Sequence, residues 1–194
     1  MQLNNQYMQK LKPLKAYFIS LILLFISSST TYAYSDAPIK TLQKHELFHN
    51  FSGDISAELA IVKQQKKAGL LLFFSTQHCP FCQRMKKTVL NQATVQQYFK
   101  SHFQMIEIDM ESAQTLTDQQ QQHISYKSYA KTQRVRLTPT IIFLGTSGEK
   151  LYQHTGIIAN PTEFLWLGEY VTQGHTKHLS FAQFKTNKRK QTPR

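Results

Sequence analysis

Apolar and polar residues occur along the chain in blocks that predict alternating helices and strands. The run at 70–74 is uniformly apolar, which is typical of a strand covered on both faces. Just before this run, Asp54 is a suitable N-cap for a helix that extends to about residue 68, with Gly69 beyond its end. The apolar positions of this helix follow helical spacing: Ile55, Leu59 and Val62.

The same patterns predict three elements after the apolar run. Residues 94–99 favour a short helical piece, and residues 103–109 predict a second strand. A longer helix begins near residue 79. Three apolar residues mark its buried face: Met85, Val89 and Leu90.

A Gln-rich stretch follows the second predicted strand, and its composition is ambiguous. Tyr126, Tyr129 and Ala130 share one face at helical spacing, so helix is favoured over disorder. Residues 119–122 are then interpreted as a solvated helix surface rather than an aggregation tract.

The last part of the chain predicts a hairpin and a helix. Two short apolar runs at 140–144 and 151–154 flank a turn signal at 146–149. The segment 160–163 places Asn at the cap, Pro at the first helical position and Glu at the third, which is a strong helix start. The order of elements indicates an α/β fold.

The N-terminal residues have the pattern of a secretory signal. Apolar residues at 16–26 follow a basic segment, and small residues at 31–33 fit a cleavage site that makes Tyr34 the mature start. The apolar stretch is shorter than the roughly 20 residues that span a bilayer, so we favour cleavage over a retained anchor. The predicted location is outside the cytoplasm, in the bacterial periplasm, without membrane insertion after cleavage.

Positive charge dominates the composition, with a net charge of +12 at pH 7. Part of it lies in a basic C-terminal tail at 185–194, which contains no acidic residue. Such a tail could bind anionic lipid or nucleic acid, but a solvated terminus is the more frequent outcome. We therefore expect no nucleic-acid partner.

The chain contains two cysteines, in the motif Cys79-Pro80-Phe81-Cys82. The motif follows the first strand and opens a helix, where free N–H groups and the helix dipole stabilise a thiolate at Cys79. Cys82, one turn later, could attack a mixed disulfide formed by Cys79. Pro80 suits the first helical position because it has no N–H to lose.

Other uses of the two cysteines are weaker. A structural disulfide across so short a loop would contribute only about 2 kcal/mol. Zinc needs four ligands, and c-type haem attachment needs His at residue 83, which is Gln. We predict no metal site and no organic cofactor beyond a redox-active Cys79–Cys82 disulfide; a soft-metal chaperone that adds His78 as a ligand is the alternative.

Several motifs together resemble the thioredoxin fold, and in particular exported thioredoxin-related proteins of the SoxW type, over residues 51–184. The motifs are 71–74, 79–82, 106–109, 136–140, Gly156 and 170–174. The resemblance implies a central mixed sheet with helices on both faces. The predicted organisation is a signal peptide at 1–33, a thioredoxin-like domain at 34–184 and the basic tail.

The resemblance also implies a substrate site. Pro139 would be cis and lie against Cys79, and it would expose the Thr138 backbone to an extended substrate segment. A trans proline at the start of an edge strand is the alternative. His78, Pro80 and Phe81 complete the predicted substrate contacts.

Three features depart from the family pattern. Phe73 stands where thioredoxins have a buried acid, so proton transfer at Cys82 would need water or another group. His78 replaces the usual Trp; as a cation it would lower the pKa of Cys79, and an exposed loop residue is the alternative. The stretch 111–134 is longer than in a minimal thioredoxin and would shape substrate choice.

The sequence therefore predicts an exported thiol–disulfide oxidoreductase that exchanges disulfides with protein substrates. The short chain favours a reductase, which would need electrons from a membrane partner. An exported oxidant or isomerase of the same fold, the soft-metal chaperone and a non-catalytic adaptor are the other hypotheses.

Overall fold

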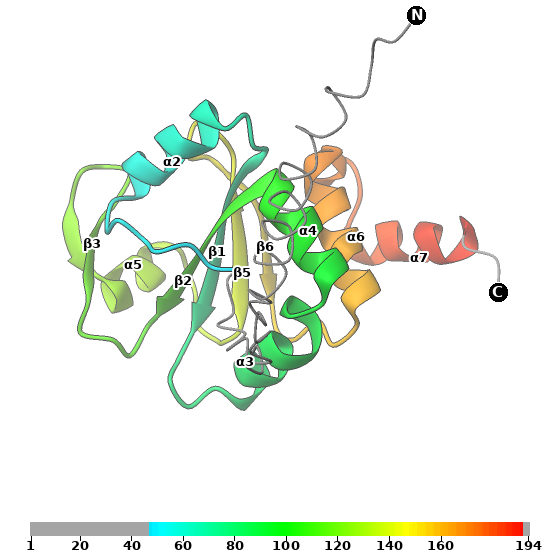
Figure 1. The fold of residues 1–194 in the computed structure, drawn as a ribbon, viewed down its shortest axis with the longest axis horizontal. Coiled ribbons are helices and arrows are strands. Elements are labelled where there is room, and N and C mark those ends of the chain that lie inside the picture. The colour runs from blue at the N-terminus through cyan, green and yellow to red at the C-terminus, as the bar shows by residue number, and fades with distance from the viewer. Residues whose placement is uncertain (1–46, 192–194) are drawn as a thin grey trace, which may run out of the picture. The chain divides into compact units, whose positions relative to one another are not determined.

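The computed structural model describes residues 47–191, so the predicted signal peptide at 1–33 lies outside the described residues. The centre is a mixed sheet of four strands: β1 (Gly69–Ser75), β2 (Phe103–Asp109), β5 (Thr140–Leu144) and β6 (Lys150–Thr155). Their order is β2-β1-β5-β6 (Figure 1). β1 is parallel to β2 and antiparallel to β5, which forms a hairpin with β6.

Helices cover both faces of this sheet. One face carries α2 (Ile55–Gln64) and α5 (Tyr126–Thr132). The other carries α3 (Pro80–Met85), its π-helical continuation Lys86–Leu90, α4 (Ala93–His102) and α6 (Pro161–Thr172). Figure 1 shows these two layers on opposite sides of the strands. The predicted thioredoxin-type α/β fold is confirmed.

The central strand β1 explains why the apolar run is uninterrupted. Leu70, Leu72 and Phe74 pack into the core under α2 and α5. Leu71 and Phe73 point to the opposite face and join the core under α3, α4 and α6. All seven residues of β1 are buried, so the strand has no solvent-facing side on which polar residues would alternate with apolar ones.

The helix before β1 begins as predicted but ends earlier. The Asp54 side chain accepts hydrogen bonds from the N–H groups of Ser56 and Ala57. The helix stops at Gln64, and Gly69 is the first residue of β1 rather than a helix terminator. A Cβ at Gly69 would lie 2.2 Å from the carbonyl oxygen of Leu144, so close strand pairing requires glycine there.

The Gln-rich segment forms a small hairpin, and the prediction that residues 119–122 belong to a helix is wrong. Strands β3 (Thr115–Thr117) and β4 (His123–Ser125) pair antiparallel around these residues. The Asp118 side chain accepts hydrogen bonds from the N–H groups of Gln120 and Gln122. In this turn the backbone N–H groups donate to a side chain instead of to the carbonyl groups of a helix. Helix α5 then occupies the predicted Tyr-rich stretch.

Residues 185–191 of the predicted solvated tail are helical, and the rest of the tail lies outside the described residues. Helix α7 (Phe181–Gln191) buries Phe181 and Phe184 in the core beside α6. Lys185 and Arg189 both form ion pairs with Glu163, at 3.1 and 2.5 Å. Packing and charge together therefore attach this basic segment to the domain.

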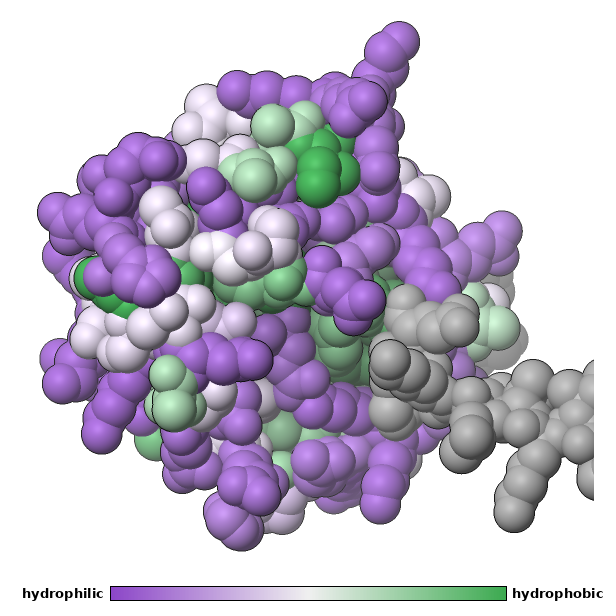
Figure 2. Space-filling model, turned by 60° about the vertical axis from the view of Figure 1, so that its left-hand side comes forward, coloured by the Kyte–Doolittle hydropathy of each residue, from purple (hydrophilic) through white to green (hydrophobic). Residues whose placement is uncertain are grey.

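The remaining predicted elements agree with the structure. The hairpin of β5 and β6 has the expected turn, and Asn160 caps α6 with Pro161 at its first position. Within residues 47–191, no helix is both long and apolar enough to cross a membrane. Figure 2 shows a mostly hydrophilic surface on the side that it turns forward.

Candidate active site

The two cysteines lie where β1 leads into α3, as the sequence predicts. They form a disulfide. Cys79 is the N-cap of α3, and its Sγ accepts a hydrogen bond from the N–H of Cys82 at 3.1 Å. Cys79 keeps 5% of its surface exposed, whereas Cys82 is fully buried. The pair is therefore asymmetric: Cys79 lies at a helix N-terminus and keeps a small exposed area, whereas Cys82 has none.

The helix that carries the pair is held firmly by its inner face. Pro80 is its first residue, as predicted. Met85, Val89 and Leu90 are buried in the core, and the helix continues through the π-helical segment that includes the last two. Short π-helical segments are frequent at functional sites because they alter the direction of nearby side chains.

A second loop reaches the same end of the sheet. Thr140 of β5 pairs with Phe74 of β1, so the residues before β5 lie beside the chain that leads to Cys79. The Thr138–Pro139 peptide bond is cis. Pro139 is buried and Thr138 half-buried, and the Pro139 carbonyl accepts a hydrogen bond from the N–H of Gly156 at 2.9 Å.

Apolar surface is available on both of these segments. Phe81, within the motif, is 54% exposed, and Leu137, one residue before Thr138, is 66% exposed. They are the exposed large apolar side chains of residues 47–191. Sequence analysis identified Phe81 as a contact residue and missed Leu137, although its place beside the Thr-Pro dipeptide was a usable signal. Both side chains are therefore candidates for contact with a substrate.

The loop before Cys79 is fixed by a residue that the sequence analysis did not select. One Glu111 side-chain oxygen accepts a hydrogen bond from the N–H of Gln77 at 3.2 Å and lies 3.8 Å from Nδ1 of His78. The His78 side chain is 84% exposed. His78 is therefore an exposed loop residue, which was the alternative prediction. When His78 is protonated, the Glu111 carboxylate balances its charge.

Phe73 is buried in the same core as both cysteines, so the strand supplies no acid there. An acid comes instead from the neighbouring strand: Glu107 lies in register with Phe73. It forms an ion pair with Lys86 and accepts a hydrogen bond from Ser75 Oγ at 2.5 Å. Lys86 also lies 6.0 Å from the centre of the Phe73 ring. Sequence analysis missed this cluster because only the strand register brings it together.

Metal coordination has little support from the geometry. Among residues 47–191, no three side chains of His, Cys, Asp or Glu lie close enough together to hold a metal ion. His78 points toward Glu111 rather than completing a set with the cysteines.

The fold and the disulfide-bonded Cys-x-x-Cys pair at the start of α3 define a thiol–disulfide oxidoreductase. A sequence model described as a thioredoxin-like domain matches residues 55–172, and the chain belongs to this family. No curated protein matches the sequence at a significant level.

Solved structures resemble the chain at low identity. A thioredoxin-fold protein from Helicobacter pylori is 22% identical with a TM-score of 0.60, over 75% of this chain and 89% of that protein. A putative disulphide-isomerase from Bacteroides thetaiotaomicron is 24% identical with a TM-score of 0.49, over 66% of this chain and 91% of that one. The first likeness supports the fold.

Proposed function

We propose that this protein is an exported thiol–disulfide oxidoreductase that reduces disulfides of protein substrates. The observation that carries the proposal is the asymmetry of the Cys79–Cys82 pair, with Cys79 at the helix N-terminus and slightly exposed while Cys82 is fully buried. Cys79 is the attacking thiolate, and Cys82 is the resolving thiol.

The exchange proceeds in two balanced steps. The Cys79 thiolate attacks one sulfur of the substrate disulfide, forms a mixed disulfide and releases the other substrate sulfur as a thiolate. The Cys82 thiolate then attacks Cys79 Sγ, which releases the second substrate sulfur. Two electrons pass to the substrate, and the protein is left with the Cys79–Cys82 disulfide.

Local hydrogen bonding supports Cys79 as the nucleophile. The N–H of Cys82 donates to its sulfur at 3.1 Å, and a charge-assisted bond of this kind is stronger when the sulfur is an anion. The dipole of the helix acts in the same direction. Because Cys82 is buried, an external disulfide cannot reach it directly, and it reacts only with the mixed disulfide formed at Cys79.

We expect the substrate to contact two segments, the residues around Cys79 and the loop before β5. An extended substrate chain would pair with the backbone of Thr138 beside Pro139, as in strand addition. The exposed Phe81 ring, next to Pro80, offers an apolar contact, and His78 lies at the rim. No bound cofactor is needed, because the electrons reside in the sulfur pair itself.

Export and the direction of electron flow are further parts of the proposal. The signal pattern at 1–33 supports export to the periplasm. Within residues 47–191 no large helical insertion interrupts the thioredoxin-type order of elements, which supports a reductase. A reductase in an oxidising compartment needs a continuing source of electrons, for which a membrane dithiol partner is suited.

Variants of the two cysteines test the reaction. Cys82→Ser should accumulate a mixed disulfide with a peptide disulfide, detected by mass spectrometry, because the resolving thiol is missing. Cys79→Ser should form none and should lose reductase activity. Full activity of Cys79→Ser would favour a non-catalytic adaptor and contradict the proposal.

The equilibrium potential against glutathione tests the direction. A reductase should lie nearer about −270 mV than about −120 mV. A value at the oxidising end would replace the reductase with an oxidant or isomerase and leave the chemistry unchanged.

The metal alternative is tested by titrating the reduced protein with Cu(I). A tight stoichiometric site that requires His78, in a protein inert toward disulfides, would indicate a chaperone instead of an enzyme.

A further inference from the structure

One face beside the active site carries several basic residues that form no ion pair within residues 47–191. The chain contains no acidic residue from 119 to 148, a stretch that includes α5 and the loop before Pro139. Its basic residues form what we call the α5 basic surface: Lys127, Lys131, Arg134 and Arg136. All four are exposed. Within the described part of the chain, none of them forms an ion pair with a carboxylate, whereas four other cations do.

One end of the α5 basic surface borders the loop that precedes the disulfide. Lys127 lines a groove of about 520 Å³ together with Thr76 and Glu111. Thr76 accepts a hydrogen bond from the N–H of Cys79 at 3.2 Å. The Glu111 carboxylate in the same groove contacts His78, so we expect an acidic substrate residue to bind at Lys127 itself, beside the loop that leads to Cys79.

The other end of the surface borders the second loop of the site. Arg136 is next to Leu137 and two residues from Thr138, to which the proposed function assigns the substrate backbone. Arg136 thus directly precedes the exposed apolar Leu137 in the chain, and Lys127 lies beside the loop that leads to Cys79.

Hydrophilic residues dominate the side of the molecule that Figure 2 turns forward, with small apolar patches between them. A partner for this surface needs negative charge. A second copy of this chain is disfavoured, because Lys and Arg outnumber Asp and Glu and two copies would bring like charges together.

We propose that the α5 basic surface binds acidic residues that flank the disulfide of the protein substrate. The proposal rests on the proposed function and specifies its substrate class: disulfides within acidic protein segments. Complementary charges at the rim of an interface mainly accelerate association and make it sensitive to salt. The expected preference is therefore kinetic and should weaken as ionic strength rises.

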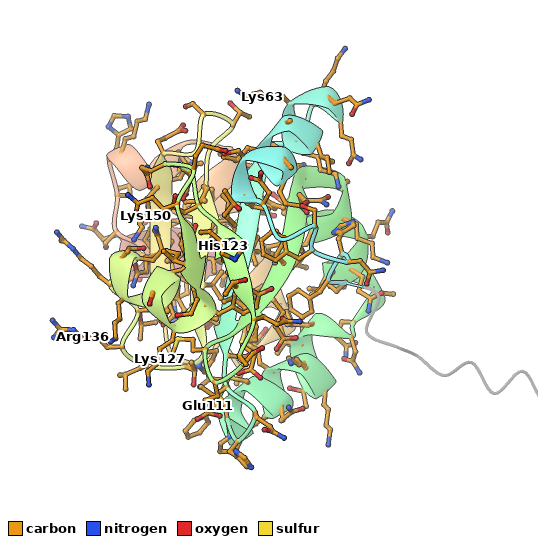
Figure 3. The ribbon with its side chains drawn as sticks, turned by 90° about the vertical axis from the view of Figure 1, so that its left-hand side faces the viewer. Lys63, Glu111, His123, Lys127, Arg136 and Lys150 are labelled. Atoms are coloured by element: carbon orange, nitrogen blue, oxygen red, sulfur yellow. A yellow bond between two sulfur atoms is a disulfide. The ribbon has the colours of Figure 1, made fainter. Side chains whose placement is uncertain are left out.

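Figure 3 provides a matched control for charge reversal. Lys127 and Arg136 lie near the end of the molecule marked by Glu111, and Lys63 on α2 lies at the opposite end. Lys63 is also exposed and also lacks an ion pair among the described residues. Reversing Lys63 changes the net charge without changing the α5 basic surface.

The experiment compares two synthetic peptides with the same internal disulfide, one flanked by Glu residues and one by Gln residues. Dithiothreitol supplies the electrons and regenerates the Cys79–Cys82 dithiol. At about 20 mM salt the unaltered protein should reduce the Glu peptide with a kcat/KM about tenfold above that of the Gln peptide. The ratio should approach about 1 at 0.5 M salt.

Variants locate the preference. The double variant Lys127→Glu with Arg136→Glu should bring the ratio of kcat/KM for the Glu and Gln peptides to about 1 or below. Lys127→Gln with Arg136→Gln should give an intermediate ratio. The control Lys63→Glu should retain at least half of the preference. An equal rate for both peptides in the unaltered protein, or an equal loss with Lys63→Glu, would overturn the proposal. Failure to reduce either peptide would contradict the proposed function instead.

Discussion

At the scale of single residues, the polar cluster beside the active-site helix is the least expected feature of the site. Lys86 and Glu107 are mostly buried, and Ser75 donates to the same carboxylate. A buried charge that loses its partner keeps its desolvation cost, so each member of such a pair depends on the other.

Glu107→Gln should therefore destabilise the protein. The change leaves Lys86 without its counter-charge, and we expect the free energy of unfolding to fall by about 1–3 kcal/mol in urea titrations. Glu111→Gln is the control, because its exposed contact with His78 should contribute less than about 1 kcal/mol. Equal, small effects of both changes would contradict the role given to Glu107.

Single residues also show which parts of the site can be predicted from the sequence. The cysteine pair, Pro80 and the Thr138–Pro139 dipeptide are local motifs, so reading them needs no tertiary information. Glu107 and Glu111 become site neighbours through the pairing of β1 with β2 and the path of the following loop. No spacing along the chain encodes those contacts, and sequence analysis missed both.

At the scale of elements, α7 shows how a basic terminus becomes part of the core. Phe184 is buried and its ring lies 5.5 Å from that of Tyr170 and 4.9 Å from that of His175. The Tyr170 hydroxyl donates to the carbonyl of Leu179 in the linker to α7. The charged residues dominate the composition of this segment, but its few aromatic residues determine its packing.

Phe184→Ala should thus reveal the contribution of α7. Removal of a buried aromatic ring should lower the free energy of unfolding by about 3 kcal/mol, measured by urea denaturation. Lys190→Ala, at an exposed position of the same helix, should change it by less than about 0.5 kcal/mol. If the two variants have the same stability, α7 does not pack as the structure shows.

Elements with strong periodicity or caps were predictable, and those set by local turns were not. The apolar run of β1 and the Asn160–Pro161 start of α6 define their elements almost by themselves. Gln119–Gln122 has good helix formers, yet Asp118 folds the backbone into a turn. Helix propensity contributes little free energy per residue, so a side chain that accepts hydrogen bonds directly from the backbone can override it.

At the scale of the whole molecule, two partly buried histidines couple stability to pH. Burial, with a further contribution from Lys185, lowers the pKa of His154. Burial also lowers the pKa of His49. Both groups bind protons more readily in the unfolded chain, so stability is fully present above about pH 6.5 and is lost as the pH falls below it.

The free energy of unfolding should accordingly decrease between pH 7 and pH 5, a range above the titration of ordinary carboxyl groups. His154→Leu should reduce this slope, and His123→Gln, at an exposed position, should leave it unchanged. Urea titrations at several pH values measure the effect. An undiminished slope in His154→Leu would show that another group is responsible.

The central claim is that Cys79 is ionised at neutral pH and accessible in the reduced protein. Alkylation by iodoacetamide measured against pH, with mass spectrometry to assign the site, tests it most directly. We expect Cys79 to react before Cys82, with its rate half-maximal at a pH below the value of about 8.5 for a free cysteine. A half-maximum at or above that value, or preferential labelling of Cys82, would contradict the account.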